Sequence, residues 1–400
     1  MQRPAESPTI PADAEPELVR RKRISRLMIF FALGYFTEGV GQQAGLLNQP
    51  LMNFAKLVYH WTPLQISAYI VGITWLPWII KPLYGMVSDF VPLFGYRRKG
   101  YLIASNLLAS VAFLVIAMTT NSGPLIFLLL LTAYGMAVAS TLYGALLVEN
   151  GQEFTASAAF VNQQWLWFNI AQVGALLIGG ALVEYLPPTS ALHWGAVVVA
   201  IVPLCVVIAT PILVEEKRTP ANMEGLKKAF GALVATFKRR ELWIIAVFVF
   251  VYRLNPGLGQ STAFYYYLTD HMKFSQGFIG IMNAIIAGGW IAGALLYRYF
   301  LPDISSKALL NLSIAAGIVC TLAYFFLQGT ISAIWISTLF GMAFAVIYVA
   351  SISIAADFCP PLTEGFAIGI LTSLYNPSSV ASHNGRSYLY ENVFHGALAP

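Results

Sequence analysis

Long apolar stretches, separated by short polar segments, follow one another along most of the chain. A helix needs about 20 apolar residues to cross a bilayer, and about eleven stretches approach or exceed that length, the last one more weakly. They cover residues 27–47, 64–87, 101–119, 124–148, 160–183, 192–214, 242–267, 278–300, 309–327, 331–356 and 366–394. This pattern predicts an all-α integral membrane protein of about eleven spans.

The polar segment between the sixth and seventh stretches divides the chain into two halves. We expect a disordered cytoplasmic tail at 1–26, an N-terminal half of six helices at 27–214 and a linker at 215–241. A C-terminal half of about five helices follows at 242–400.

Apolar residues recur at helical spacing within the linker, at Leu226, Phe230, Leu233 and Phe237, with lysines between them. This spacing predicts a short amphipathic helix over about 222–237 that lies on the inner headgroup surface. A simple tether between the halves explains the segment equally well, and both descriptions can hold together.

Composition supports a membrane environment. Hydrophobic residues make up 58% of the 400 positions and charged residues only 10%, whereas a soluble globular chain carries about 25% charged residues. The 3 cysteines and 5 histidines are scattered, without the spacing of a metal site. We therefore expect neither a metal nor a cofactor.

Basic residues are distributed unevenly between the two sides of the predicted bundle. With the N-terminus inside, 18 of the 23 Lys and Arg residues fall in cytoplasmic segments, and the outside loops contain only Lys56 and Lys273. The positive-inside rule therefore predicts a cytoplasmic N-terminus, and we expect the bacterial inner (plasma) membrane. The net charge of +5 then reflects topology, so no nucleic-acid partner is expected.

The most distinctive motif is the segment 76–102, LPWIIKPLYGMVSDFVPLFGYRRKGYL. Gly85 would let another helix approach closely, and Asp89 would pair with basic residues beyond the turn at Gly95 or with a helix N-terminus. Such a latch would hold one arrangement of the halves and release in the other. A basic turn that only fixes topology is the alternative. The candidate gating residues are Lys81, Gly85, Asp89, Gly95, Arg97 and Arg98.

This segment resembles the loop motif that carriers of the major facilitator superfamily place between their second and third helices. Its expanded form, with Lys81-Pro82 before Gly85 and the run 92–98 after it, is similar to the folate–biopterin transporter family. The layout of six helices, a basic linker and further helices also matches the superfamily. Further matching positions are Tyr35, Phe36, Glu38, Gly39, 147–149, Pro256, 264–266, 274–280, Cys359, Pro360, Glu364, Asn376 and Gly385.

The resemblance implies a secondary active transporter that moves a small organic solute, of pterin or folate type, by alternating access. It implies a monomer whose partners are the lipid bilayer, the small-molecule substrate and protons, and a symport mechanism. The sequence contains no G-x-x-x-x-G-K-[ST] segment, so we expect an ion gradient, not ATP, as the energy source.

The chain departs from the family pattern in two respects. The family's fourth span is expected to carry acidic residues where Ser140 and Gly144 stand here, and their loss could change the coupling ion or the substrate. The family is also expected to have twelve helices. Because the sequence given ends at Pro400, about where a twelfth helix would begin, we expect a shortened chain or an incomplete gene model.

Charged side chains within a span are costly in hydrocarbon and are candidates for function. Tyr35, Glu38 and Gln42 share one face of the first helix, and Arg253 lies close to Pro256 in the seventh. Either Glu38 and Arg253 face an aqueous cavity and hold substrate or a proton, or each has a fixed partner that only maintains assembly.

Amides within the fifth and eleventh spans are further candidates. Trp165 and Asn169 share a helix face in a segment rich in amides and indoles, which favours cavity lining over contact with lipid. Asn376 lies in the eleventh span, together with His383 and Arg386.

For a pterin or folate, these residues suggest a specific mode of binding. The carboxylate of Glu38 would accept hydrogen bonds from the amino-pyrimidinone edge, and Trp165, Tyr143 or Tyr266 would stack on the ring. The guanidinium of Arg253 would bind a glutamate tail, and Glu38 would also be the proton acceptor.

Two other readings remain open. Carriers of muropeptides or acetyl-coenzyme A share this layout and similar loop motifs, and a non-transporting sensor or assembly factor could keep the same scaffold. An enzyme is not expected, because the sequence has no His-rich cluster, no G-x-S-x-G segment and no paired carboxylates on one helix with a partner base.

Overall fold

The computed structural model describes residues 17–42, 44–238, 240–254, 261–300, 304–357 and 375–396. Within these residues every regular element is a helix. In this part of the chain, 8 helices are long and apolar enough to cross a membrane. The predicted all-α class is confirmed.

The N-terminal half is a bundle in which α1 packs on α8 and α9, while α6 packs on α7 and α9. Its elements are α1 (Glu17–Gly41), α2 (Asn48–Leu57), α3 (Pro63–Ile66), η2 (Ser67–Gly72), α4 (Ile73–Ile79), α5 (Lys81–Phe90), α6 (Lys99–Ile116), α7 (Ser122–Glu153), α8 (Ser157–Tyr185) and α9 (Pro188–Leu213).

In the C-terminal half, α15 packs on both α13 and α14. After the linker helix α10 (Met223–Phe237), the elements are α11 (Arg240–Arg253), α12 (Thr262–Asp270), α13 (Gln276–Phe300), α14 (Ser306–Ala323), η3 (Tyr324–Phe326), α15 (Thr330–Asp357), α17 (Tyr375–Tyr388) and η4 (Leu389–Val393).

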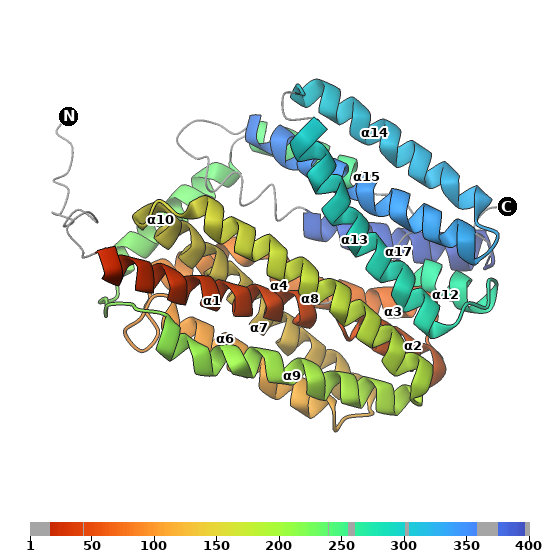
Figure 1. Cartoon of the computed structure of the whole chain (residues 1–400), viewed down its shortest axis with the longest axis horizontal. Coiled ribbons are helices and arrows are strands. Elements are labelled where there is room, and N and C mark those ends of the chain that lie inside the picture. The colour runs from red at the N-terminus through yellow and green to blue at the C-terminus, as the bar shows by residue number, and fades with distance from the viewer. Residues whose placement is uncertain are drawn as a thin grey trace.

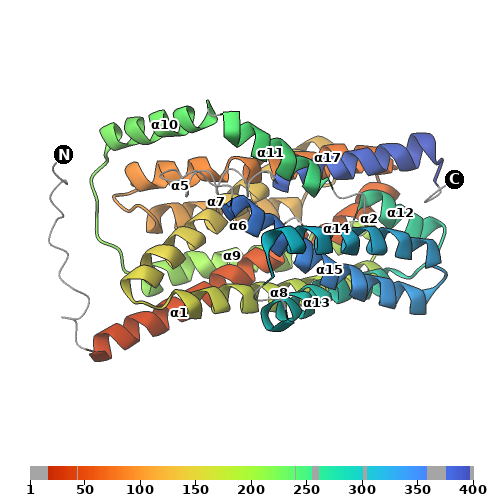
Figure 2. The ribbon, with the colours of Figure 1, turned by 90° about the horizontal axis from the view of Figure 1, so that it is seen from above.

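The two halves lie side by side, with most helix axes roughly parallel (Figure 1). They meet where α8 packs along α13 and where α17 packs on η2 and α4. The linker helix α10 lies beside α5, on the edge of the bundle (Figure 2). A cavity between the halves is therefore bounded by helices that belong to both.

The predicted spans correspond to these helices with shifted ends. Three of them are not among the eight apolar spans: the first lies in α1, the seventh in α11 and α12, and the eleventh in α17 and η4. Residues 255–260 and 366–374, parts of the seventh and eleventh predicted spans, lie outside the described residues. The number eleven therefore stays a prediction.

The basic segment before the first span is helical, so the expected disorder of 1–26 is wrong from Glu17 onward. The positive charges find partners on other elements. Arg23 Nη2 lies 3.3 Å from Glu153 Oε1 and Arg26 Nη1 lies 2.5 Å from Glu215 Oε1. Arg20 donates to the backbone oxygen of Phe154 at 2.9 Å. These contacts extend α1 by anchoring its first turns to the neighbouring segments.

The second span is a helical run that departs from helical geometry at one residue, Ile80, where α4 ends and α5 begins. Pro82 has no N–H, so it cannot bond to the carbonyl four residues earlier, at Trp78. Asn376 Nδ2, on α17 of the other half, donates to that oxygen at 2.8 Å. Because an unpaired carbonyl is costly inside a membrane, this contact ties α17 to the break.

The linker begins with a strap, residues 215–222, that is bonded to the N-terminal half. The carboxylate of Glu216 accepts from the backbone N–H groups of Arg97, Arg98 and Lys99 at 2.8 to 3.0 Å. Further along, the strap makes backbone hydrogen bonds from Thr219 N to Gly95 O at 3.0 Å and from Asn222 N to Phe90 O at 2.8 Å. Helix α10 follows where the sequence predicts a short helix, and its contact with a membrane surface stays a prediction.

Candidate functional site

A cavity of about 1670 Å³ lies between the two halves. Side chains of α1, α4, α5, α7 and α8 form one wall, and side chains of α13, α14, α15 and α17 form the other. Pockets for drug-sized ligands measure roughly 300–1,000 Å³, so this cavity has room for an organic solute and surrounding water.

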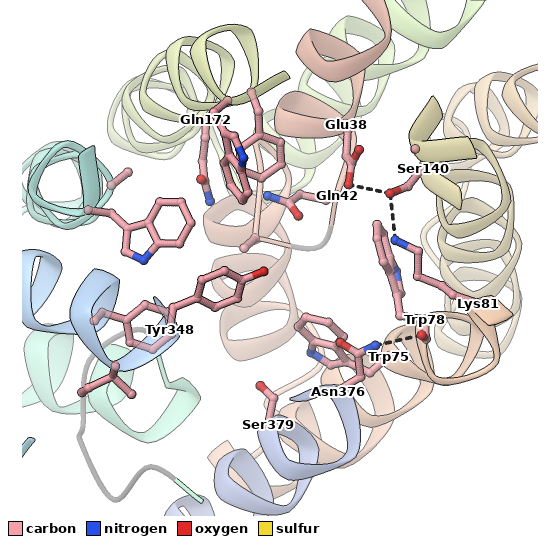
Figure 3. Close-up of a pocket in the computed structure, with 18 of the residues that line it drawn as sticks. Glu38, Gln42, Trp75, Trp78, Lys81, Ser140, Gln172, Tyr348, Asn376 and Ser379 are labelled. Atoms are coloured by element: carbon pink, nitrogen blue, oxygen red, sulfur yellow. Dashed lines mark hydrogen bonds between the residues drawn. The ribbon is translucent and has the colours of Figure 1, made fainter. Parts of the chain in front are cut away.

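On the N-terminal wall, two charged side chains are joined through a hydroxyl. Lys81 Nζ donates to Ser140 Oγ at 2.9 Å, and Ser140 Oγ donates to Glu38 Oε1 at 2.7 Å (Figure 3). Glu38 Oε2 is buried and has no hydrogen-bond partner among the described residues. Glu38 is therefore balanced by a nearby cation, yet keeps one oxygen that a ligand could use.

Lys81 lies with this group and not with the other predicted gating residues. Its Nζ is 4.8 Å from the ring centroid of Trp78, and both side chains line the cavity. Ser140, one of the two positions at which the chain differs from the family pattern, is part of the site, since its hydroxyl bridges Glu38 and Lys81. Gly144, the second departure, also lines the cavity, and a Cβ added there would meet nothing within 4 Å.

The other predicted residues of the first helix, Tyr35 and Gln42, also line the cavity. Tyr35 is buried at 2% exposure and packs on Tyr143, with ring centroids 5.8 Å apart. Gln172 of α8 lines the cavity together with Gln42, and both are labelled in Figure 3. The shared face of the first helix thus forms part of the site.

Helix α17 presents a polar face to the cavity from the opposite half. Asn376, Ser379, His383 and Arg386 line the cavity and recur at helical spacing. The polar residues in the weak eleventh span carried this signal, but only Asn376 was predicted as a site residue. Arg386 brings a guanidinium to this wall.

The cation predicted at Arg253 cannot be placed, because that side chain lies outside the described residues. Helix α11 ends at this residue. Its role stays a prediction.

Aromatic side chains line both walls. Trp165 packs on Trp290 with ring centroids 5.2 Å apart, and Trp290 packs on Tyr348 at 5.4 Å. Trp75 and Trp78 face the cavity from α4. Flat apolar groups of a ligand could therefore contact rings on either side.

Three side chains expected at the site have structural partners instead. Asn169 is not among the residues that line the cavity, and its Nδ2 donates to the backbone oxygen of Trp165 at 2.6 Å. Tyr143 is fully buried and donates to Asn106 Oδ1 at 3.0 Å. Tyr266 donates to the backbone oxygen of Trp61. Both hydroxyls and the Nδ2 of Asn169 are thus bonded within the bundle, which helical spacing alone does not reveal, whereas Asn169 Oδ1 is buried without a partner among the described residues.

The loop motif forms an ionic cluster within the N-terminal half. Arg98, only 5% exposed, pairs with Asp89 and with Glu149 Oε1, the latter at 2.6 Å, and Arg97 Nη2 lies 3.0 Å from the same Glu149 oxygen. Burial lowers the pKa of Arg98, but Glu149 and Asp89 raise it by more, so the pKa lies above its ordinary value. Arg98 stays charged and holds α5, α6 and α7 together.

The structure requires glycine at one of two positions in the motif, Gly95, but not at the other, Gly85. Gly95 has φ +83°, a left-handed turn that favours glycine. At Gly85 the predicted close approach is wrong in this conformation, because an added Cβ would lie 3.6 Å from Thr141, an ordinary contact. The helix N-terminus near the motif is occupied by Glu216 and not by Asp89.

The cavity is bounded at one end by contacts between the halves, and we call this region the closed end. Gln49 Nε2 donates to the backbone oxygen of Gln276 at 2.7 Å, Tyr265 donates to Asn53 at 3.2 Å and Lys56 pairs with Asp270. The cavity reaches the other end, the motif end, where Asp89, Glu149 and Ala229 line it.

Comparison with known proteins gives a family and relatives. The chain matches the sequence model of the BT1 family over residues 40–393. It is similar to the "Folate-biopterin transporter" of Synechocystis, with 26% identity over 376 residues, covering 89% of this chain and 73% of the relative. It is also similar to "Probable folate-biopterin transporter 6" of Arabidopsis thaliana, with 27% identity over 304 residues, covering 72% of this chain and 59% of the relative. The chain thus spans only about three fifths of the second relative.

Among solved structures, the fold is similar to the crystal structure of the nucleoside transporter NupG. The TM-score is 0.71 at 15% sequence identity, over 92% of this chain and 91% of that chain. At this identity the likeness concerns the fold alone, and it confirms the predicted two-half bundle of major-facilitator type.

Proposed function

This chain belongs to the BT1 family, and on that basis we propose that it carries a pterin- or folate-like solute across a membrane by alternating access, coupled to protons. Family membership makes it an integral membrane carrier and not an enzyme, as the sequence predicts. The observation that supports the substrate class most directly is the cavity, with a carboxylate on one wall and a guanidinium on the other.

The N-terminal wall suits the amino-pyrimidinone edge of a pterin. Glu38 Oε2 has no hydrogen-bond partner in the part of the chain that the structure describes, and a carboxylate accepts paired N–H donors in parallel. A flat ring held there would meet the indoles of Trp75 and Trp78 on one side or of Trp165 and Trp290 on the other.

The C-terminal wall suits an anionic tail. Arg386 lines the cavity together with His383 and Ser379 on one face of α17, and a guanidinium binds a carboxylate bidentately. We therefore propose for Arg386 the same role that is predicted for Arg253. A folate, with a ring at one end and a glutamate at the other, would span the two walls.

The proposal includes the orientation of the protein in the membrane and the conformational state of the structure. The bias of basic residues supports a cytoplasmic N-terminus, and in a bacterial inner membrane the motif end would then face the cytoplasm. The conformation would then be inward-facing, with the closed end outside. Glu38 is the proton acceptor in this scheme, and the carrier acts as a monomer.

The test is uptake by purified protein in proteoliposomes with an imposed proton gradient. We expect saturable uptake of a radiolabelled pterin or folate that increases with the inward gradient. Saturable uptake of only an anhydromuropeptide or acetyl-coenzyme A would replace the substrate. If none of these solutes enters but one of them raises the unfolding temperature, a sensor on a carrier scaffold would be the better description.

A further inference from the structure

At the closed end, each half places one carboxylate on the N-terminus of a helix in the other half. Glu184, near the end of α8, accepts from the backbone N–H of Gly277 in α13 at 2.9 Å. Glu391, in η4, accepts from the backbone N–H of Leu64 in α3 at 3.3 Å. Helix α3 opens the continuous helical run Pro63–Phe90, so both acceptor sites are the starts of long helices.

The two helix starts are built alike. In each, a hydroxyl residue precedes the helix and accepts from the third helical N–H: Thr62 from Gln65 at 3.3 Å, and Ser275 from Phe278 at 3.2 Å. The second helical N–H of each, at Leu64 or Gly277, is then bonded by the carboxylate of the opposite half. The first N–H groups of a helix have no partner within it and carry partial positive charge, so each carboxylate binds an unfilled donor.

The arrangement follows the approximate two-fold relation between the halves. In the predicted order of spans, α8 is the fifth and α17–η4 the eleventh, while the helices that begin at α3 and α13 are the second and eighth. Each carboxylate therefore comes from an equivalent position, six spans apart, and binds an equivalent helix. Inverted or parallel repeats give carriers such paired sites.

Other contacts at the closed end hold the two halves close together, but they do not involve Glu184 or Glu391. The α8–α13 crossing is tight, since a Cβ on Gly180 would lie 2.8 Å from Gly280 Cα, and this places Glu184 beside the start of α13. Lys56 and Asp270 form an ion pair between the halves, with Lys56 Nζ 4.4 Å from the centroid of Tyr266. Any separation of the halves at this end must break both carboxylate contacts.

We propose that Glu184 and Glu391 are a symmetric pair of positioning residues that set how readily the closed end opens during transport. Both contribute, because each carboxylate accepts from the second N–H of its helix, Glu184 at 2.9 Å and Glu391 at 3.3 Å. The proposal rests on the alternating access proposed above, but it does not depend on the identity of the substrate.

The test measures opening directly, without substrate. Gly144→Cys places a thiol in the cavity where an added Cβ meets nothing within 4 Å, in a chain whose 3 native cysteines are replaced by alanine. A membrane-impermeant maleimide is added on the side of the closed end in oriented vesicles. Glu184→Gln, Glu391→Gln and the double variant are compared with Glu224→Gln, a control on α10 that pairs only locally, with Lys228.

Each single change should raise the labelling rate about fivefold, since a carboxylate at a helix N-terminus contributes up to about 1 kcal/mol. The double variant should show the product, roughly 25-fold, because sites that share no partner act additively. Glu224→Gln should label like the parent, and labelling from the motif end should persist in all variants, which shows that they fold. Unchanged labelling in the double variant, or a full effect from one change alone, would overturn the proposal.

Discussion

At the scale of single residues, the site depends on a hydroxyl between two charges. Ser140 Oγ accepts from Lys81 and donates to Glu38, so the cation and the carboxylate of the N-terminal wall are held without direct contact. The carboxylate keeps Oε2 without a partner among the described residues. The hydrogen bonds of Lys81 and Ser140 therefore leave one oxygen of Glu38 unused.

The first prediction concerns Glu38 as the proton acceptor. Glu38→Gln keeps the size and one acceptor oxygen but removes the titratable group, so accumulation against a gradient should fall by at least tenfold while exchange of substrate continues, with a higher KM because one acceptor is lost. Both are measured in proteoliposomes, with and without an imposed proton gradient.

Glu224→Gln, on the surface of α10, is the matched control and should accumulate normally. Concentrative uptake that survives Glu38→Gln would show that another group carries the proton.

The second prediction concerns the carbonyl that Pro82 leaves free. Asn376→Leu removes the donor to Trp78 O and should lower the stability by about 1–3 kcal/mol, the range for leaving a buried polar group unsatisfied. The measurement is thermal unfolding in detergent. Asn392→Leu, which removes a bond from Nδ2 to the exposed Tyr388 O at 3.2 Å, should have little effect; equal losses in both variants would remove the special role of Asn376.

At the scale of elements, the crossing of α8 and α13 decides whether the closed end can shut. The two helices approach at Gly180 and Gly280, where a Cβ on either glycine would lie 2.8 Å from the Cα of the other. Small residues permit such contact between membrane helices. A side chain at this point would hold the halves apart.

The third prediction follows from that geometry. Gly180→Ala should favour the conformation with the closed end open, raising labelling of Gly144→Cys from that side about tenfold and reducing transport. Gly174→Ala is the matched control on the same helix, since its added Cβ meets nothing within 4 Å. If Gly180→Ala labels and transports like the control, the crossing does not limit closure.

Sequence patterns identified the helices and part of the site, for reasons visible in particular residues. A charge in an apolar run has few tolerable positions, so Glu38 in the cavity was predictable. Its link to Lys81 through Ser140 was not, because three helices must assemble to form it. The bond of Asn169 to its own helix, four residues back, was not visible either, because an amide on a helix can bond to the backbone or to a ligand with the same spacing. Helix α1 begins early because Arg23 and Arg26 have partners distant in the chain.

At the scale of the whole molecule, the linker belongs with the first half. The strap follows the sixth predicted span and lies against the loop motif, where Glu216 accepts from three successive N–H groups. The carboxylates that pair with Arg98 among the described residues, Asp89 and Glu149, also lie in that half. In this conformation the ion pairs of the motif join elements of the N-terminal half, and its action as a latch between the halves stays a prediction.

The fourth prediction tests the strap. Glu216→Ala removes the acceptor at the start of α6 and should speed tryptic cleavage after Arg218 about five- to tenfold, because a helix cap contributes about 1 kcal/mol and the cut requires local release. Limited proteolysis in detergent is the measurement. Glu224→Ala, beyond the strap, should not change the rate; equal protection of Arg218 in both variants would show that Glu216 does not hold the strap.

The position of the strap also bears on how the protein is made. Residues 215–222 leave the ribosome directly after the sixth predicted span and before any residue of the C-terminal half. Their partners, at 90–99, have by then been synthesised. The first half therefore has its closing segment available while the second is still being translated, and its basic loop need not wait for the other half to become ordered.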